Sequence, residues 1–227
     1  MPEISLPTVT HEQFLVYLNC ARQFYYESVL NLTPVSGRHI ASGIGSAVIK
    51  SLIIPVGSQQ NSQFLDRKLE IVKKEFPDAF HYYLQYAEKL LLQGQHWLGV
   101  HAVYEPEPIE ITCGHLRFQF VPHQIIQEGT SQLIFRLFVY SKITEKSQRY
   151  KMMRWIARHL KGMWSEHSVS LQLANLDTGE IQQVAPYYRI DSVRLPVLAN
   201  QLVSGDFSPC NRPQACLSCR HFTYCPA

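Results

Sequence analysis

The chain has no long apolar run and little charge. No stretch approaches twenty apolar residues, the length that a membrane-spanning helix requires. The first thirty residues contain no basic segment followed by an apolar one, so we expect neither a signal peptide nor a membrane span. Charged residues make up 17% of the chain and the net charge is +3. This excess is too small to indicate a nucleic-acid partner, so the positions of the charges must decide.

Cysteine is also scarce, and its distribution is uneven. Four of the 6 cysteines lie between Cys210 and Cys225, near the end of a chain of 227 residues. We expect a cytoplasmic, reducing compartment, in which clustered cysteines bind metal more often than they form disulfides. The chain is 46% hydrophobic, enough for a sizeable core, and we interpret residues 1–227 as a single domain.

A Cys-x2-Cys-x5-Cys pattern, made by Cys216, Cys219 and Cys225, lies in a predicted loop over residues 205–227. Two thiolates separated by two residues can bind one metal from a tight turn, and the third provides a further ligand. The fourth ligand is either Cys20, in a predicted N-terminal helix, or Cys210, in the same loop. The Cys20 set would close the loop onto the first helix, whereas the Cys210 set would form a local zinc site. Structural or disulfide-linked cysteines are a third interpretation.

The first half of the chain has the periodicity of helices. Thr10 and Gln13 predict a capping box at the start of a helix that ends near residue 31 and contains Cys20. Further helices are predicted over 39–54, 62–76 and 78–97. The last two form a predicted helical insertion over about 56–98, whose mixed Lys, Glu and Gln content is typical of a solvated surface.

The second half changes to the pattern of strands. Strands are predicted near 101–112, 115–126, 132–143, 167–176 and 180–185, with helices at 147–163 and 192–203. The segment from Leu133 to Tyr140 is nearly all apolar, as in a strand that is covered on both faces. We therefore predict an α/β (α+β) fold with a mixed central sheet flanked by helices.

A helix that carries Cys20-x-Arg22-x-Phe-Tyr-Tyr26, a strand hairpin, a helix, another strand and the terminal cysteine pattern follow one another in this chain. This set resembles the iron–sulfur branch of the PD-(D/E)XK nuclease superfamily, which includes RecB-type nuclease domains and CRISPR-associated exonucleases with four cysteines. The resemblance covers most of the chain in the order of elements, with specific residues at 17–26 and 207–225. It implies a restriction-endonuclease-like core and a [4Fe–4S] cluster bound by Cys20, Cys216, Cys219 and Cys225.

The catalytic motifs of that superfamily are not found where the resemblance places them. Its enzymes bind Mg²⁺ or Mn²⁺ with an acid on one strand and an acid-x-Lys motif on its partner. The first acid should lie near 121–123 and the second motif near 139–142, yet the only carboxylate between Ile111 and Ile143 is Glu128. Lys142 is the one candidate catalytic residue, or else a solvated lysine at a strand end. We therefore predict an inactive enzyme.

Relocated acids are the alternative that would preserve catalysis. Glu105, Glu107 and Glu110 precede the predicted hairpin, and they are the candidates for carboxylates that have moved to the site. Only in that case do we expect a Mg²⁺ or Mn²⁺ cofactor.

The predicted helix over 147–163 carries cations along one side. These are Lys151, Arg154, Arg158 and Lys161, with Trp155 at their border, and no acidic residue lies between Arg149 and Lys161. A row of cations beside an aromatic ring suits a phosphate backbone with a base stacked on the ring. The alternative is an ordinary solvated face, although such faces usually mix charges of both signs.

Together these patterns predict an inactive, nuclease-fold, iron–sulfur protein that binds DNA, either single-stranded or at ends. An accessory role beside a helicase or an active nuclease in DNA repair, recombination or defence follows from the resemblance alone. Two other functions stay open. One is an active metal-dependent exonuclease with relocated carboxylates, and the other is a zinc-stabilised module for protein interactions.

Overall fold

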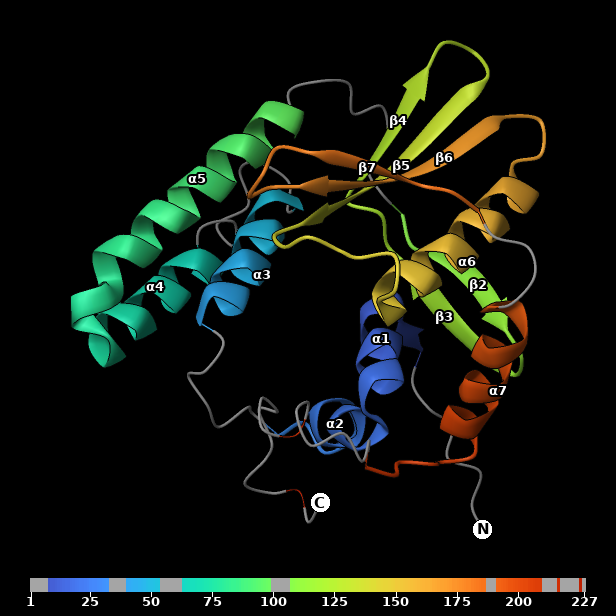
Figure 1. The fold of residues 1–227 in the computed structure, drawn as a ribbon, viewed down its shortest axis with the longest axis horizontal. Coiled ribbons are helices and arrows are strands. Elements are labelled where there is room, and N and C mark those ends of the chain that lie inside the picture. Colours follow the sequence, from blue (N-terminus) through green and yellow to red (C-terminus); the bar gives the residue numbers. More distant parts are fainter. Residues whose placement is uncertain are drawn as a thin grey trace.

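The computed structural model describes residues 8–32, 40–53, 63–98, 107–186 and 191–209, together with Cys216 and Cys225. In these residues the chain has an α+β fold, with two mixed β-sheets and helices around them (Figure 1), which confirms the predicted fold class. None of the helices described is both long and apolar enough to cross a bilayer.

The helices come mainly from the N-terminal half. They are α1 (His11–Asn19), α2 (Ala21–Phe24), a π-helix (Tyr25–Val29), α3 (Ile40–Ile53), α4 (Gln63–Glu75), a 3₁₀-helix (Pro77–Ala79), α5 (Phe80–Leu98), α6 (Gln148–Met163) and α7 (Asp191–Val203). The strands are β1 (Val9–Thr10), β2 (Ile109–Cys113), β3 (Leu116–Phe120), β4 (Gln124–Glu128), β5 (Gln132–Val139), β6 (Ser168–Asn175) and β7 (Ile181–Val184).

The prediction of one central sheet, with a single strand over 115–126, is wrong. One sheet has the order β1-β3-β2 and the other the order β4-β5-β6-β7. Residues 121–123 separate β3 from β4, and the proline at their centre has no N–H to donate to a strand ladder. As a result β3 pairs with β2, whereas β4 pairs with β5.

Strand β5 is the central strand of the larger sheet and is buried on both faces. It pairs antiparallel with β4 and parallel with β6, to which it is connected through α6. Alternate side chains, among them Phe135 and Leu137, belong to the core that contains α6, while Phe138 belongs to the core that contains α3 and α5. The apolar segment therefore does form a strand that is covered on both sides.

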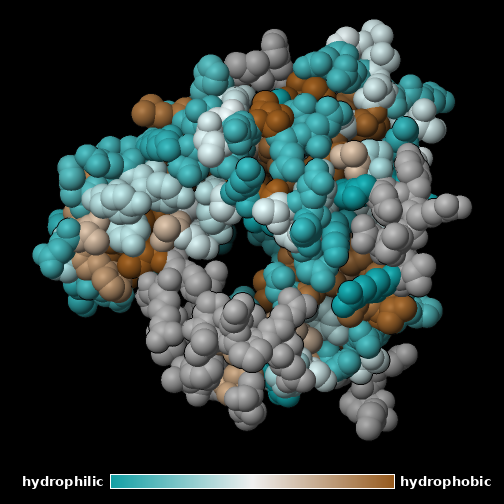
Figure 2. Space-filling model, in the orientation of Figure 1, coloured by the Kyte–Doolittle hydropathy of each residue, from teal (hydrophilic) through white to brown (hydrophobic). Residues whose placement is uncertain are grey.

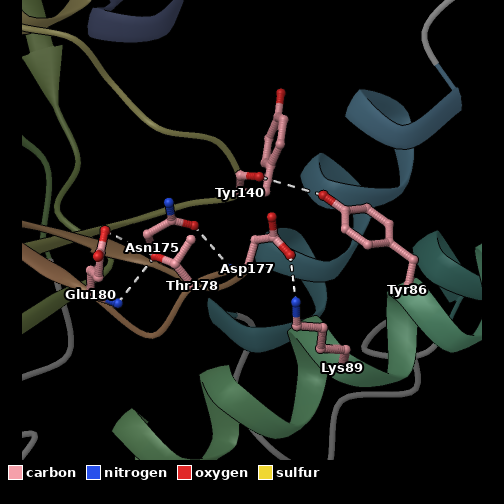
Figure 3. A network of polar contacts seen from close by, with 7 residues as sticks. All are labelled: Tyr86, Lys89, Tyr140, Asn175, Asp177, Thr178 and Glu180. Carbon is pink, nitrogen blue, oxygen red and sulfur yellow. Dashed lines mark hydrogen bonds and ion pairs between the residues drawn. The ribbon is translucent and has the colours of Figure 1, made fainter.

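The described part of the predicted insertion, residues 63–98, packs on the sheet through α3. Val72 of α4 and Leu90 of α5 are buried against α3, whereas the outer surfaces of both helices are exposed. Polar contacts also connect α5 to the end of β5 and to the β6–β7 turn (Figure 3). The Tyr86 hydroxyl donates to the Tyr140 carbonyl at 3.4 Å, and Lys89 forms an exposed ion pair with Asp177 at 2.7 Å.

The predicted helix over residues 10–31 is interrupted at Cys20. The capping box is confirmed: the Gln13 N–H donates to Thr10 Oγ1, and the Thr10 N–H donates to Gln13 Oε1. At Cys20, however, the backbone is extended, with φ −159° and ψ 110°, and α2 begins at the next residue. Cys20 therefore lies in a break between two helices rather than on the surface of one.

Candidate functional site

The C-terminal segment that precedes the cysteine loop is held against α1 and α2. The chain leaves α7 and runs back past these helices (Figure 1), where the Tyr17 hydroxyl donates to the Asp206 carbonyl at 2.9 Å. The ring of Phe207 lies 6.2 Å from that of Phe24 and 5.0 Å from that of Tyr25, measured between centroids. These contacts bring the start of the loop to the helices on either side of Cys20.

The cysteines themselves are described in part. Cys20, Cys216 and Cys225 are half-buried, whereas Cys210 and Cys219 lie outside the described residues. Among the residues described, no three His, Cys, Asp or Glu side chains are grouped to hold a metal. Four thiolates are a donor set that fits either an iron–sulfur cluster or zinc, and the ligand set remains a prediction.

The remaining cysteine, Cys113, lies away from the C-terminal segment, on β2. It is buried at the end of β2, and burial raises the pKa of its thiol to about 12. Because the thiolate is the form that binds metal, Cys113 is unsuited to be a ligand.

A cavity of about 480 Å³ lies at the position where the resemblance places the first catalytic acid. Figure 2 shows a hollow between the part of the molecule that contains α3–α5 and the part that contains α1. The cavity is bounded by α1, α3, the β3–β4 connection, the residue after β5 and the first turn of α6. Its polar lining residues are Thr10, His11, Glu12, Asn19, Gln23, Ser46, Lys50, His123, Tyr140 and Arg149.

Two buried histidines form part of the cavity wall. The backbone N–H of Phe138 donates to His123 Nδ1 at 2.8 Å, so the proton of the neutral ring is on Nε2. Burial, with the charges of His11 and Arg149, lowers the pKa of His123 to about 3. Burial and the charge of Arg149 lower the pKa of His11 to about 4, against a hydrogen bond to the Gln119 backbone that raises it. Both imidazoles are therefore neutral at pH 7.

The charges around the cavity are those of an anion site. Glu12 is the only carboxylate among the described residues that line it, whereas Lys50 and Arg149 are both cationic there. A divalent ion such as Mg²⁺ needs carboxylate oxygens to offset the loss of its hydration. The structure thus brings two positions of the expected motifs, His123 and Tyr140, into one cavity without the acids that a metal-dependent nuclease uses.

Lys142 does not line this cavity. It is exposed and borders a different one of about 450 Å³, in which Glu180 is the only carboxylate among the described residues. Glu107 and Glu110 are exposed and line neither cavity, while Glu105 lies outside the described residues. The structure therefore does not bring the candidate lysine together with Glu107 or Glu110, the two of these carboxylates that it describes.

The basic row on α6 is present, but Trp155 is wrongly included in it as a stacking surface. Only 4% of Trp155 is exposed, and its ring packs against Phe118 and His159, with centroids 5.4 Å and 3.9 Å away. An enclosed ring offers no face to a base. Lys151, Arg154 and Arg158 are half-buried and Lys161 is exposed, and Arg154 Nε donates to the Ala185 carbonyl at 3.2 Å.

Sequence reasoning missed Arg149 as a site residue. It precedes the basic row by two positions, which at 100° per residue places it on the side of α6 opposite Arg158. This side faces the cavity, so α6 presents cations in two directions. The signal available in the sequence was this angular separation, because Arg149 falls outside the arc that the other cations share.

No protein-family model matches this chain, and none of the curated proteins matches it. Among solved structures, the crystal structure of SSO0001 aligns with 95% of this chain and 95% of its own. The two share 14% sequence identity, with a TM-score of 0.39. A similarity this distant supports no statement about function.

Proposed function

We propose that this protein binds DNA without hydrolysing it, and that it is an accessory subunit of nuclease-like fold with an iron–sulfur cluster bound by Cys20, Cys216, Cys219 and Cys225. The observation that carries the proposal is the charge of the cavity at the expected catalytic position. One glutamate and two permanent cations line it among the described residues. Such a site attracts phosphate and has too few acids to hold the metal that hydrolysis requires.

The basic row on α6, made by Lys151, Arg154, Arg158 and Lys161, supports the same function. Its cations lie on one helix that contains no acidic residue, so a phosphate backbone along it would meet no carboxylate of α6 itself. The contacts of Tyr17 and Phe207 support the role proposed for the cluster, which is to join the first helices to the end of the chain. A metal centre that joins distant segments stabilises the fold because it lowers the entropy of the unfolded chain and because metal binding adds folding free energy.

The basic row is tested with the double variant Lys151→Ala, Lys161→Ala. These cations contact phosphate in the proposal, so the affinity for a 30-nucleotide single strand should fall. The slope of log K against log salt should decrease in magnitude by about 1.4, since each phosphate contact on a single strand contributes about 0.7. Fluorescence anisotropy across a salt series measures both. The matched control is Arg67→Ala, Lys74→Ala, which removes two exposed cations from α4. Equal losses of affinity in both double variants would show that binding depends on net charge and not on the basic row.

A second candidate, the zinc-stabilised interaction module, is distinguished by metal content. Protein purified without oxygen should contain iron and inorganic sulfide. One zinc per chain in colourless protein would favour the local zinc site that includes Cys210, and binding of an acidic protein without binding of DNA would then replace the proposed function.

A further inference from the structure

The wall of the cavity contains a buried polar atom that has no partner. His11 is 4% exposed, and its Nδ1 makes no hydrogen bond in the described part of the chain. A hydrogen bond to the Gln119 backbone raises the pKa of the ring, although burial and Arg149 lower it further. Nδ1 is the ring nitrogen that has no partner among the described residues. A buried polar atom without a hydrogen bond costs free energy, and this cost falls if the ring changes its protonation or gains a partner.

The second feature is the positive charge of Arg149, which forms no ion pair with an acidic residue in the described part of the chain. It occupies the first turn of α6, which contains no acidic residue, and the positive end of the helix dipole disfavours a cation there. Lys50 adds charge at the rim, where its ammonium lies 5.6 Å from the centroid of the Phe64 ring. An anion in the cavity would be attracted by Arg149, by Lys50 and by the end of the helix together.

We propose that the cavity binds one phosphate group of the nucleic acid directly, without a metal ion, and that His11 gains a proton when the phosphate enters. Arg149 donates to the phosphate oxygens, and the negative charge of the phosphate favours a proton on the neighbouring ring of His11. Glu12, Lys50, His123, Tyr140 and Arg149 are the titratable or charged groups that line the cavity with His11. This inference rests on the proposed function. It adds a second contact between the protein and the nucleic acid, on the side of α6 opposite the basic row.

Phosphate binding and protonation of His11 should favour each other. Burial and, after it, the positive charge of Arg149 disfavour a proton on His11. A phosphate would offset the charge of Arg149 and raise the pKa of His11, so binding should take up a proton and become tighter as the pH falls from 8 to 6. The second pKa of a terminal phosphate is about 6, and protonation of the ligand would weaken attraction to Arg149. A gain in affinity at lower pH therefore reports on the protein.

The probes are a hexathymidylate with a 5′-phosphate and its 5′-hydroxyl twin, titrated calorimetrically in EDTA. Arg149→Gln should weaken binding about tenfold or more, the effect expected for one charge-assisted hydrogen bond. Arg67→Gln, on exposed α4, is the matched control and should change binding less than about twofold. A difference between the twins identifies a terminal phosphate, while equal sensitivity of both identifies an internal phosphodiester.

His11→Gln supplies the second readout, because a glutamine can donate an N–H but does not titrate. This variant should lose the gain in affinity at lower pH, whereas the wild type should keep it. If His11→Gln fails to fold, as thermal unfolding would reveal, Arg149→Gln should still reduce the proton uptake measured in two buffers of different ionisation enthalpy. Unchanged binding of both probes by Arg149→Gln overturns the proposal. The proposed function survives that outcome if the 30-nucleotide strand still depends on Lys151 and Lys161.

Discussion

At the scale of single residues, the two buried histidines control the chemistry of the cavity. His123 connects the β3–β4 segment to β5, because its ring Nδ1 accepts the Phe138 N–H and its backbone N–H donates to the Arg136 carbonyl at 2.9 Å. Its ring also packs against Phe138, with centroids 5.6 Å apart. A carboxylate, the residue that the resemblance implies here, would be a buried charge, whereas a neutral imidazole accepts the backbone N–H without burying a charge.

Acid should therefore destabilise the fold through His11 and His123. Their pKa values are about 4 and about 3 in the folded chain, against 6.5 for an ordinary histidine. The unfolded chain binds more protons than the folded one between these values, so the contribution of the neutral rings is complete above pH 6.5 and is lost as the pH falls toward 4. Urea unfolding between pH 7.5 and 4.5 measures the slope.

The variant His123→Gln separates this effect from that of the carboxylates. It should be less stable than the wild type at pH 7.5 and should lose less stability on acidification. A variant with the same acid slope as the wild type would show that other groups cause the loss.

At the scale of elements, the close approach of α3 to β5 defines one side of the cavity. A Cβ added at Gly45 would lie 2.3 Å from Cγ of the Tyr140 ring, and Tyr140 Oη lies 2.9 Å from Ser42 Oγ on the same helix. Tyr140 also lines the cavity. A glycine at this position thus sets the distance between α3 and the end of the central strand.

Two glycine substitutions in helices should have opposite effects. Alanine is better than glycine in a helix by up to about 1 kcal/mol, and nothing lies within 4 Å of a Cβ added at Gly162 of α6. Gly162→Ala should therefore stabilise the protein, whereas Gly45→Ala should destabilise it by displacing Tyr140. Thermal unfolding of the two variants provides the comparison. Stabilisation by Gly45→Ala would show that α3 does not pack tightly on Tyr140.

The elements were largely predictable because local signals define them. The capping box at Thr10, the strand over residues 132–139 and the turn at Gly179, with φ +74°, all follow from neighbouring residues. The break at Cys20 was not predictable, since Ala21 and Arg22 favour a continuous helix, and neither was the division into two sheets. The burial of Trp155 depends on Phe118, more than thirty residues away, which periodicity alone does not reveal.

At the scale of the whole molecule, residues 17–25 meet residues 206–207 beside the cavity. Asn19 and Gln23, on either side of Cys20, line the cavity, and Tyr17 and Phe24 hold the segment that leads to the C-terminal cysteines. A metal centre that includes Cys20 would therefore support one wall of the cavity. We expect the cluster to affect DNA binding through this wall rather than by contact.

Weakening the contact between the two ends should loosen the cluster. Phe207→Ala removes a ring that packs against Phe24 and Tyr25, so iron of the proposed cluster should be lost to a chelator faster than from the wild type. Release of iron followed over time measures the effect. The control is Val197→Ala, an exposed apolar residue of α7. Equal rates of iron loss from Phe207→Ala and the wild type would show that this contact does not stabilise the cluster.

The most direct test of the account is the fate of end-labelled single-stranded DNA incubated with the anaerobically purified protein in Mg²⁺, in Mn²⁺ and in EDTA. We predict that the strand is bound in all three conditions and is recovered at full length in each, because Arg149, His11 and Lys50 surround the cavity where carboxylates would be needed. Shortening of the strand that requires Mg²⁺ or Mn²⁺ and is abolished by Lys142→Ala would contradict the account.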